Sequence, residues 1–256
     1  MSAHMAPIRV HRSFYSMRRI VIFFVALLFP FPSFAAIAYL ATAHNTVSTL
    51  PQTVSVTNNG NTVVICLGEY NNPGGSYTVT GVTYGGTAMT QIGTTQSANS
   101  FIYLAAYILP NAPGGANNLV ISGTTGSDGI DWAASTYSGV DTATGFDVHA
   151  QAAETNGTSP FTVSLNPAVS NEWVVVCSYD NANLVTGIYP SGSQRYYSGG
   201  ELSLFAADTN GTISTGAANY GETVSGSTFT AMNAFTIKPS ASGATIVPWY
   251  KRAWWW

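Results

Sequence analysis

Short runs of β-branched and aromatic residues alternate with turn residues along most of the chain, from residue 37 to residue 239. Such residues suit the pleated, half-buried surface of a strand, and the Asn-Gly steps at Asn59, Asn156 and Asn210 accept the positive φ angles of tight turns. Outside the N-terminal segment, no long window shows the apolar period of a helix. The pattern predicts strands at Ile37–Thr42, Thr53–Thr57, Thr62–Glu69, Tyr77–Tyr84, Phe101–Leu109, Asn118–Ser122, Ile130–Ser138, Phe161–Leu165, Glu172–Tyr179, Leu184–Tyr189, Glu201–Ala207, Thr212–Ala218 and Thr228–Lys238.

Two of these runs, Thr62–Glu69 and Glu172–Tyr179, are apolar on both faces, which is typical of central strands that are covered on both sides. Many short strands at this spacing are typical of all-β sandwiches and barrels. We therefore expect an all-β fold, an antiparallel two-sheet sandwich of the jelly-roll kind, in a single domain over residues 36–239.

The chain contains two cysteines, and they lie in similar contexts. Cys66 is followed by the VTGV tetrapeptide Val79–Val82, and Cys177 by the VTGI tetrapeptide Val185–Ile188. Two Greek keys in one sandwich or chance similarity of β-rich segments would each explain this, so no duplication is inferred. In an oxidising compartment the two cysteines can form a disulfide; the alternative is two unpaired, buried cysteines that act as small apolar residues.

The N-terminal segment has the order of a secretory signal peptide. Arg18 and Arg19 precede the ten-residue apolar run Ile20–Phe29, and small residues that suit cleavage follow up to Ala35. We expect residues 1–35 to be a signal peptide whose translation starts at Met17, and the protein to be secreted or at the cell surface. An uncleaved membrane anchor is the alternative, although the apolar run is short for a membrane span.

The number and sign of the charged residues limit the classes of molecule that the protein could bind. Only 7% of the residues are charged, and between Ile20 and Trp249 there are two basic and eleven acidic residues, a net charge of −9. So few charges exclude a coiled coil, and 12% aromatic residues exclude a disordered chain. The acidic body also excludes a nucleic-acid partner, because phosphate binding needs a basic surface.

Acidic residues supply the candidate sites. Asp128, Asp131 and Asp141 form the densest acidic cluster, for which calcium is the candidate ion, and no other cofactor is expected. The alternative is an ordinary Asp-Gly turn into a strand. Glu69 and Asp180 follow the two cysteines at the same distance, and they would suit glycoside cleavage if they faced one another. The chain contains no nucleophile-elbow, zinc-protease or P-loop motif, so no catalytic residue is assigned and a non-catalytic role is favoured.

Several segments resemble one group of exported proteins. Val82–Thr90 (VTYGGTAMT) is similar to a "V-T-Y-N-G-x-x-M-T" element, and Ala134–Asp141 (ASTYSGVD) is similar to an "A-x-S-Y-S-G-V-D" strand and turn. Tyr103–Val120 and the ending Ala234–Pro239 resemble further elements of the same group. The group is an uncharacterised secreted β-sandwich module that recurs in exported proteins of uncultured, small-genome bacteria. The resemblance implies a secreted sandwich and brings no catalytic residues with it.

Residues 240–256 read as a linker and an aromatic tail. The tail residues suited to an interaction are Trp249, Tyr250, Trp254, Trp255 and Trp256, beside two basic residues, and such sets favour a membrane interface or an aromatic docking site. The sequence thus favours a non-catalytic exported protein for binding, adhesion or assembly, with a surface glycan, a protein or a second copy as partner. A membrane would be contacted only through the signal segment or this tail. The alternatives are a carbohydrate-binding or carbohydrate-active jelly roll, and a filament or surface-layer subunit joined by strand exchange.

Overall fold

The computed structural model describes residues 35–71, 78–124, 129–157, 159–181, 185–200, 202–225 and 228–241. Within these ranges every regular element is a strand, and every paired strand is antiparallel, which confirms the predicted all-β sandwich class. Nothing in the described ranges forms a helix of the length and apolar character that crossing a membrane requires. Residues 1–34 of the predicted signal peptide and the aromatic residues of the predicted tail lie outside the described residues, whereas Ala35 is described.

The first half of the described chain forms an N-terminal sandwich of two sheets. Its inner sheet has the strand order β1-β10-β3-β8-β6, with β7 also paired to β8, and its outer sheet has the order β2-β9-β4-β5. The strands are β1 (Ala38–Val47), β2 (Gln52–Asn58), β3 (Thr62–Tyr70), β4 (Thr78–Tyr84), β5 (Thr87–Ala88), β6 (Thr90–Gln91), β7 (Gln96–Ala98), β8 (Ile102–Pro110), β9 (Gly115–Thr124) and β10 (Ile130–Ser138).

The second half forms a C-terminal sandwich on the same plan. Its inner sheet has the order β11-β18-β13-β16-β15, and its outer sheet has the order β12-β17-β14. The strands are β11 (Phe146–Gly157), β12 (Phe161–Leu165), β13 (Trp173–Asn181), β14 (Val185–Tyr189), β15 (Ser193–Tyr197), β16 (Leu202–Asp208), β17 (Ala218–Val224) and β18 (Thr228–Ile237).

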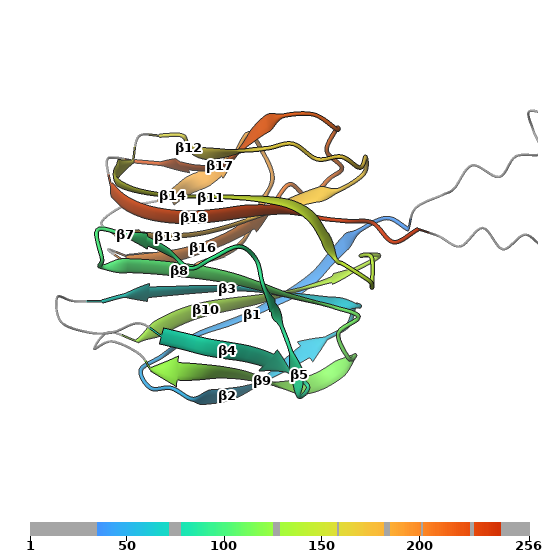
Figure 1. Ribbon diagram of the computed structural model, residues 1–256, viewed down its shortest axis with the longest axis horizontal. Coiled ribbons are helices and arrows are strands. Elements are labelled where there is room, and N and C mark those ends of the chain that lie inside the picture. The colour runs from blue at the N-terminus through green and yellow to red at the C-terminus, as the bar shows by residue number, and fades with distance from the viewer. Residues whose placement is uncertain are drawn as a thin grey trace, which may run out of the picture. The chain divides into compact units, whose positions relative to one another are not determined.

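The four sheets of the described residues stack as layers, with the two inner sheets face to face in the middle (Figure 1). Four apolar clusters fill the spaces between successive layers: one inside the N-terminal sandwich, two inside the C-terminal sandwich, and one in the seam between the inner sheets. The sequence analysis expected two sheets, and the structure has four. The reason lies in β3 and β13, which are buried along almost their whole length because each is covered by an outer sheet on one face and by the other inner sheet on its second face.

The two sandwiches share one topology, strand for strand. β1, β10, β3, β8 and β6 of the N-terminal inner sheet correspond in order to β11, β18, β13, β16 and β15, and β2, β9 and β4 correspond to β12, β17 and β14. The repeated tetrapeptides mark equivalent strands, since the pairing register shifts between Val79 and Gly81 in β4 and between Val185 and Gly187 in β14. A β-bulge thus recurs at the same position of both halves. The internal similarity seen in the sequence is therefore an internal structural repeat.

Most predicted strands are confirmed, and one is wrong. Residues 212–217 form a loop, and the strand β17 begins only at Ala218. The loop residues bond to other loops instead, because the Ile213 amide donates to the Glu172 carbonyl and the Gly216 amide to the Pro167 carbonyl. The strand β11 was not predicted, because its inward positions carry alanines and a valine, whose weak apolar alternation hides the pattern.

Both ends of the described chain meet at one point. The Ala35 amide donates a hydrogen bond of 3.1 Å to the Ser240 carbonyl, and the Ser240 amide donates to the Gly139 carbonyl at 2.8 Å. Beside them, Val140 and Pro239 form an isolated antiparallel bridge. The segment that leads into β1 and the segment that leaves β18 are therefore held next to each other by backbone hydrogen bonds.

Close packing in the seam depends on a glycine. The ring of Tyr179 in β13 lies against Gly68 of β3, where an added Cβ atom would be 2.0 Å from the Tyr179 Cδ2 atom. The Tyr179 hydroxyl also donates to Asp131 of β10 at 3.4 Å. Any side chain at residue 68 would have to displace a buried aromatic ring that belongs to the other sandwich.

We expect Gly68→Ala to lower the free energy of unfolding by about 2 kcal/mol, because it overpacks the seam against the Tyr179 ring. Chemical denaturation measures the change. Gly81→Ala is the matched control, since an added Cβ there would meet nothing within 4 Å. Equal stability of the Gly68→Ala variant and the wild type would contradict the packing described.

Candidate functional site

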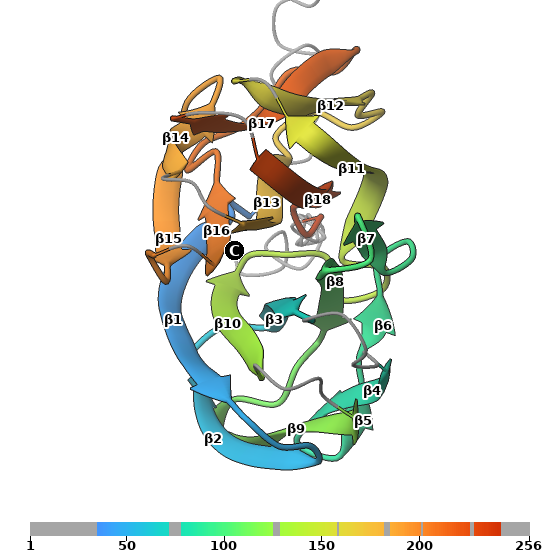
Figure 2. The same cartoon turned by 90° about the vertical axis from the view of Figure 1, so that its left-hand side faces the viewer.

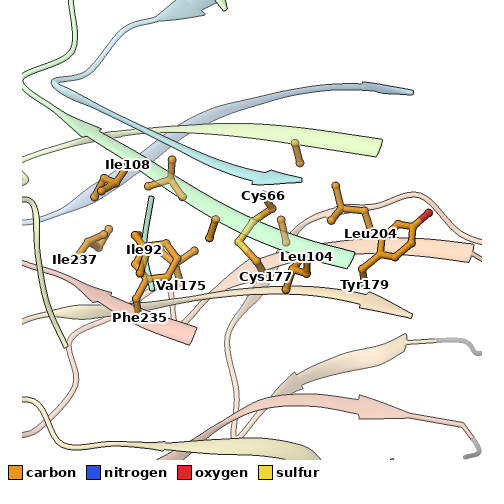
Figure 3. Packing of buried hydrophobic residues seen from close by; sticks show 14 of the residues in the cluster. Cys66, Ile92, Leu104, Ile108, Val175, Cys177, Tyr179, Leu204, Phe235 and Ile237 are labelled. Atoms are coloured by element: carbon orange, nitrogen blue, oxygen red, sulfur yellow. A yellow bond between two sulfur atoms is a disulfide. The ribbon is translucent and has the colours of Figure 1, made fainter. Parts of the chain in front are cut away.

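The centre of the seam is a disulfide. Cys66 of β3 and Cys177 of β13 are joined with their Cα atoms 5.5 Å apart, at a sequence separation of 111 residues (Figure 3). Their neighbours across the strands are small, because Cys66 pairs with Ala106 and Cys177 pairs with Ala206. Of the two alternatives considered for the cysteines, a disulfide or two unpaired buried thiols, the structure contains the disulfide. It covalently links equivalent positions of the two sandwiches.

Apolar side chains surround the disulfide on both sheets. Figure 3 shows Leu104 and Ile108 from one sandwich, and Val175, Leu204 and Phe235 from the other, around the two sulfur atoms. All five are fully or almost fully buried. The disulfide therefore lies inside a hydrophobic core, shielded from solvent.

An ionic network fastens one flank of the seam, where β1 lies beside β15 (Figure 2). Arg195 of β15 binds Asp208 of β16 through two hydrogen bonds of 2.7 Å, and the Tyr137 hydroxyl of β10 donates to the same carboxylate at 3.0 Å. The Arg195 guanidinium carbon also lies 3.8 Å from the centroid of the Tyr39 ring in β1. Asp208 is fully buried, so the bidentate pairing offsets the cost of removing its charge from water.

Amide side chains fasten the opposite flank, where β11 lies beside β7 (Figure 2). Gln151 of β11 accepts from the Thr94 amide at 3.0 Å and donates to the Thr94 carbonyl at 2.5 Å. Buried Asn233 of β18 donates to the Ile92 carbonyl at 2.8 Å. The seam is thus fixed at its centre and at both flanks.

A second polar feature lies inside the C-terminal sandwich. Five fully buried residues form what we call the carboxyl cluster, and these are Ser178 and Asp180 of β13, Ser203 of β16, Glu222 of β17 and Thr230 of β18. Ser203 and Thr230 are the neighbours of Asp180 on the two adjacent strands, so all three side chains share one face of the inner sheet. The cluster therefore forms where the inner sheet faces β17.

Hydroxyl groups hold both carboxyls of the cluster. The Thr230 hydroxyl donates to Asp180 Oδ1 at 2.6 Å, and the Ser178 hydroxyl donates to Glu222 Oε2. Burial raises the pKa of Asp180 and of Glu222, and the charge of Asp180 raises the pKa of Glu222 further. The cluster can therefore hold a positive charge, as a proton or as another cation. The sequence analysis noticed Asp180 and missed its four partners, because only the strand register brings them together.

The structure separates Asp131 and Asp141, two of the three aspartates of the predicted calcium site. Asp131 is near the start of β10, where the Thr46 hydroxyl donates to it, while Asp141 follows the end of that strand. Asp141 accepts from the Ala143 amide at 2.9 Å and faces Lys238 at 3.7 Å. Asp128 lies outside the described residues. In the described ranges no three His, Cys, Asp or Glu side chains gather at one point.

The carboxylate pair considered for glycoside cleavage is not formed. Val63, Ile65 and Leu67 of β3 face the N-terminal core, so Glu69, which alternates with them, points away from the seam. Asp180 points away from the seam in the opposite direction, toward β17. Both inner sheets therefore lie between the two carboxyls, and both residues are fully buried.

No known protein family matches the chain, and no curated protein and no solved structure is similar to it. The similarity to secreted β-sandwich modules therefore remains a resemblance carried by short motifs.

We expect replacement of both cysteines, Cys66→Ala with Cys177→Ala, to lower the free energy of unfolding by about 4 kcal/mol. The disulfide closes a loop of 111 residues, and opening it returns conformational entropy to the unfolded chain. Denaturation of the oxidised protein, the reduced protein and the double variant measures this. The reduced protein and the double variant should agree; equal midpoints for the oxidised and reduced forms would refute the role assigned to the disulfide.

Glu172 makes stability depend on pH. Its pKa is raised from 4.5 to about 7, chiefly by burial and to a smaller extent by the charge of Asp147, against the lowering effects of Thr236 and Lys238. Since the folded state holds this proton more tightly than the unfolded state, the stabilisation is complete below about pH 4.5 and lost as the pH rises to about 7. Denaturation across this window should show wild-type stability falling more steeply than that of Glu172→Gln, by roughly 2–3 kcal/mol in total. Parallel curves would exclude Glu172 as the titrating group.

Proposed function

We propose that this protein is exported and works at the cell surface or in the extracellular medium as a non-catalytic β-sandwich for binding, adhesion or assembly. The observation that carries the proposal is the disulfide between Cys66 and Cys177 at the centre of the seam. Structural disulfides form and persist in oxidising compartments and are rare in the cytosol. The signal-like segment before residue 36 supports the same destination.

The distribution of acidic side chains supports a non-catalytic role. Glu69, Asp180, Glu172 and Glu222 are fully buried, so they are shielded from a substrate in solution. The described surface has one large exposed apolar side chain, Leu40, and the chain between Ile20 and Trp249 has a net charge of −9. Such a surface keeps an extracellular protein soluble and suits polar partners such as neutral glycans.

Self-assembly is the second candidate function, and one edge strand favours it. β1 is the outermost strand of its sheet, paired only with β10. Its ten residues contain no Asp, Glu, Lys, Arg or Pro, which commonly protect an edge strand against pairing with another chain, and its one register shift lies near its start, between Tyr39 and Ala41. A partner strand from a second copy could therefore extend this sheet.

Expression of the full chain in a bacterial host, with cell fractionation and thiol labelling, tests export. We expect the protein outside the cytoplasm, with neither cysteine reacting with a maleimide until a reductant and a denaturant are added. A cytoplasmic protein with two reactive thiols would overturn the proposal.

Binding assays on the exported protein then test which kind of activity it has. A glycan array and size-exclusion chromatography distinguish glycan binding from self-association. Release of reducing sugar from a bound glycan would overturn the non-catalytic part of the proposal, whereas binding without release would support it.

A further inference from the structure

The internal repeat provides a control for the carboxyl cluster. The strand register pairs Glu69 with Ile130 in the N-terminal sandwich and Asp180 with Thr230 in the C-terminal sandwich. Glu69 and Asp180 are separated by the same 111 residues as the two cysteines, so they are equivalent positions. Ile130 is therefore the counterpart of Thr230.

Two further members of the cluster, Ser178 and Glu222, also replace apolar residues. By the same register, Leu67 of β3 is the counterpart of Ser178, and Ile121 of β9, which pairs with the residue after the bulge glycine, is the counterpart of Glu222. Leu67, Ile121 and Ile130 are fully buried in the N-terminal core. The same fold is thus built with three apolar side chains where the C-terminal sandwich has three polar ones.

The buried polar side chains of the carboxyl cluster destabilise the folded state, and the fold does not require them. Burial of a carboxyl or hydroxyl group without a full set of hydrogen bonds is unfavourable, because the group loses its hydrogen bonds to water and does not replace them. In the described structure the Ser203 hydroxyl of the cluster has no hydrogen-bond partner, and Asp180 Oδ2 and Glu222 Oε1 have none apart from the other carboxyl of the pair. Buried groups left in this way indicate a ligand, a water or an ion among them.

Charge indicates which ligand fits. The two basic side chains of the described body are engaged elsewhere, Arg195 with Asp208 and Lys238 with Asp141. In the ranges that the structure covers, the carboxyl cluster therefore lacks a cationic partner of its own. Without a cation the raised pKa of both groups means that the pair holds a proton; a divalent cation would replace that proton and neutralise both ionised carboxylates.

We propose that the carboxyl cluster binds a divalent cation of the calcium class. The two carboxylates and the three hydroxyls offer only oxygen, and an all-oxygen set of up to seven donors fits calcium, whereas zinc prefers nitrogen and sulfur and magnesium keeps several waters. Every member of the cluster lies within three residues of a strand end, at the rim of the sandwich. The inference is independent of export and of the partner of the protein.

Calcium-dependent thermal unfolding of the full-length, EDTA-treated protein tests the proposal. We expect calcium at about 100 times its dissociation constant to raise the Tm by roughly 5 °C or more, and magnesium to raise it less. Asp180→Asn and Glu222→Gln should abolish the calcium-dependent rise. Glu69→Gln is the matched control, because the N-terminal sandwich has Leu67, Ile121 and Ile130 in place of Ser178, Glu222 and Thr230, and it should keep the full rise.

Titration calorimetry with calcium chloride provides the second measurement. Wild type should show one saturable site, and Ser203→Ala, which removes a single hydroxyl, should weaken the affinity about tenfold while the protein still folds. Absence of both binding and a Tm change in the wild type would overturn the proposal. An equal calcium response in Asp180→Asn and Glu222→Gln would overturn it as well.

Discussion

The packing of β3 against β13 is the interaction on which the rest of the structure depends. Each strand is the middle of its inner sheet, and each is buried on both faces, so neither sheet can be stable while its seam side is open to water. The disulfide joins the strands at the centre of this contact, inside an apolar core shared by both sandwiches. The outer sheets cover only the remaining face of each inner sheet, and they add a separate core on each side.

The seam brings equivalent positions together, as the interface of a two-fold symmetric dimer does. Cys66 meets its counterpart Cys177, and Gly68 meets its counterpart Tyr179. The first pair is the same residue twice, while the second is a very small residue against a large one. Two identical chains cannot place glycine on one side and tyrosine on the other, but one chain that contains both halves can. The same freedom allows the C-terminal sandwich to carry Glu222 where the N-terminal sandwich has Ile121.

Local pattern was enough to predict the fold class and most strands, because runs such as Thr62–Glu69 combine β-branched composition with clear turn residues at both ends. The local pattern could not predict the number of sheets. A strand that is apolar on both faces must be covered on both faces, but its sequence does not show which elements cover it. The repeat was visible only as VTGV and VTGI, since the surrounding strands need only β-forming residues, and many different sequences meet that need. The carboxyl cluster gathers residues from four strands, so no spacing in the sequence could reveal it. Asp131 and Asp141, close in sequence, are instead separated by the length of β10.

The hydrogen bond between Ala35 and Ser240 has a mechanical consequence. The described chain therefore begins and ends at one point, beside the isolated bridge between Val140 and Pro239. Tension along the chain would be carried across the short backbone contact between residues 35 and 240 before it reached either core. A linker between these two residues would also close the described chain into a ring, in which new termini could be opened at a turn on another side.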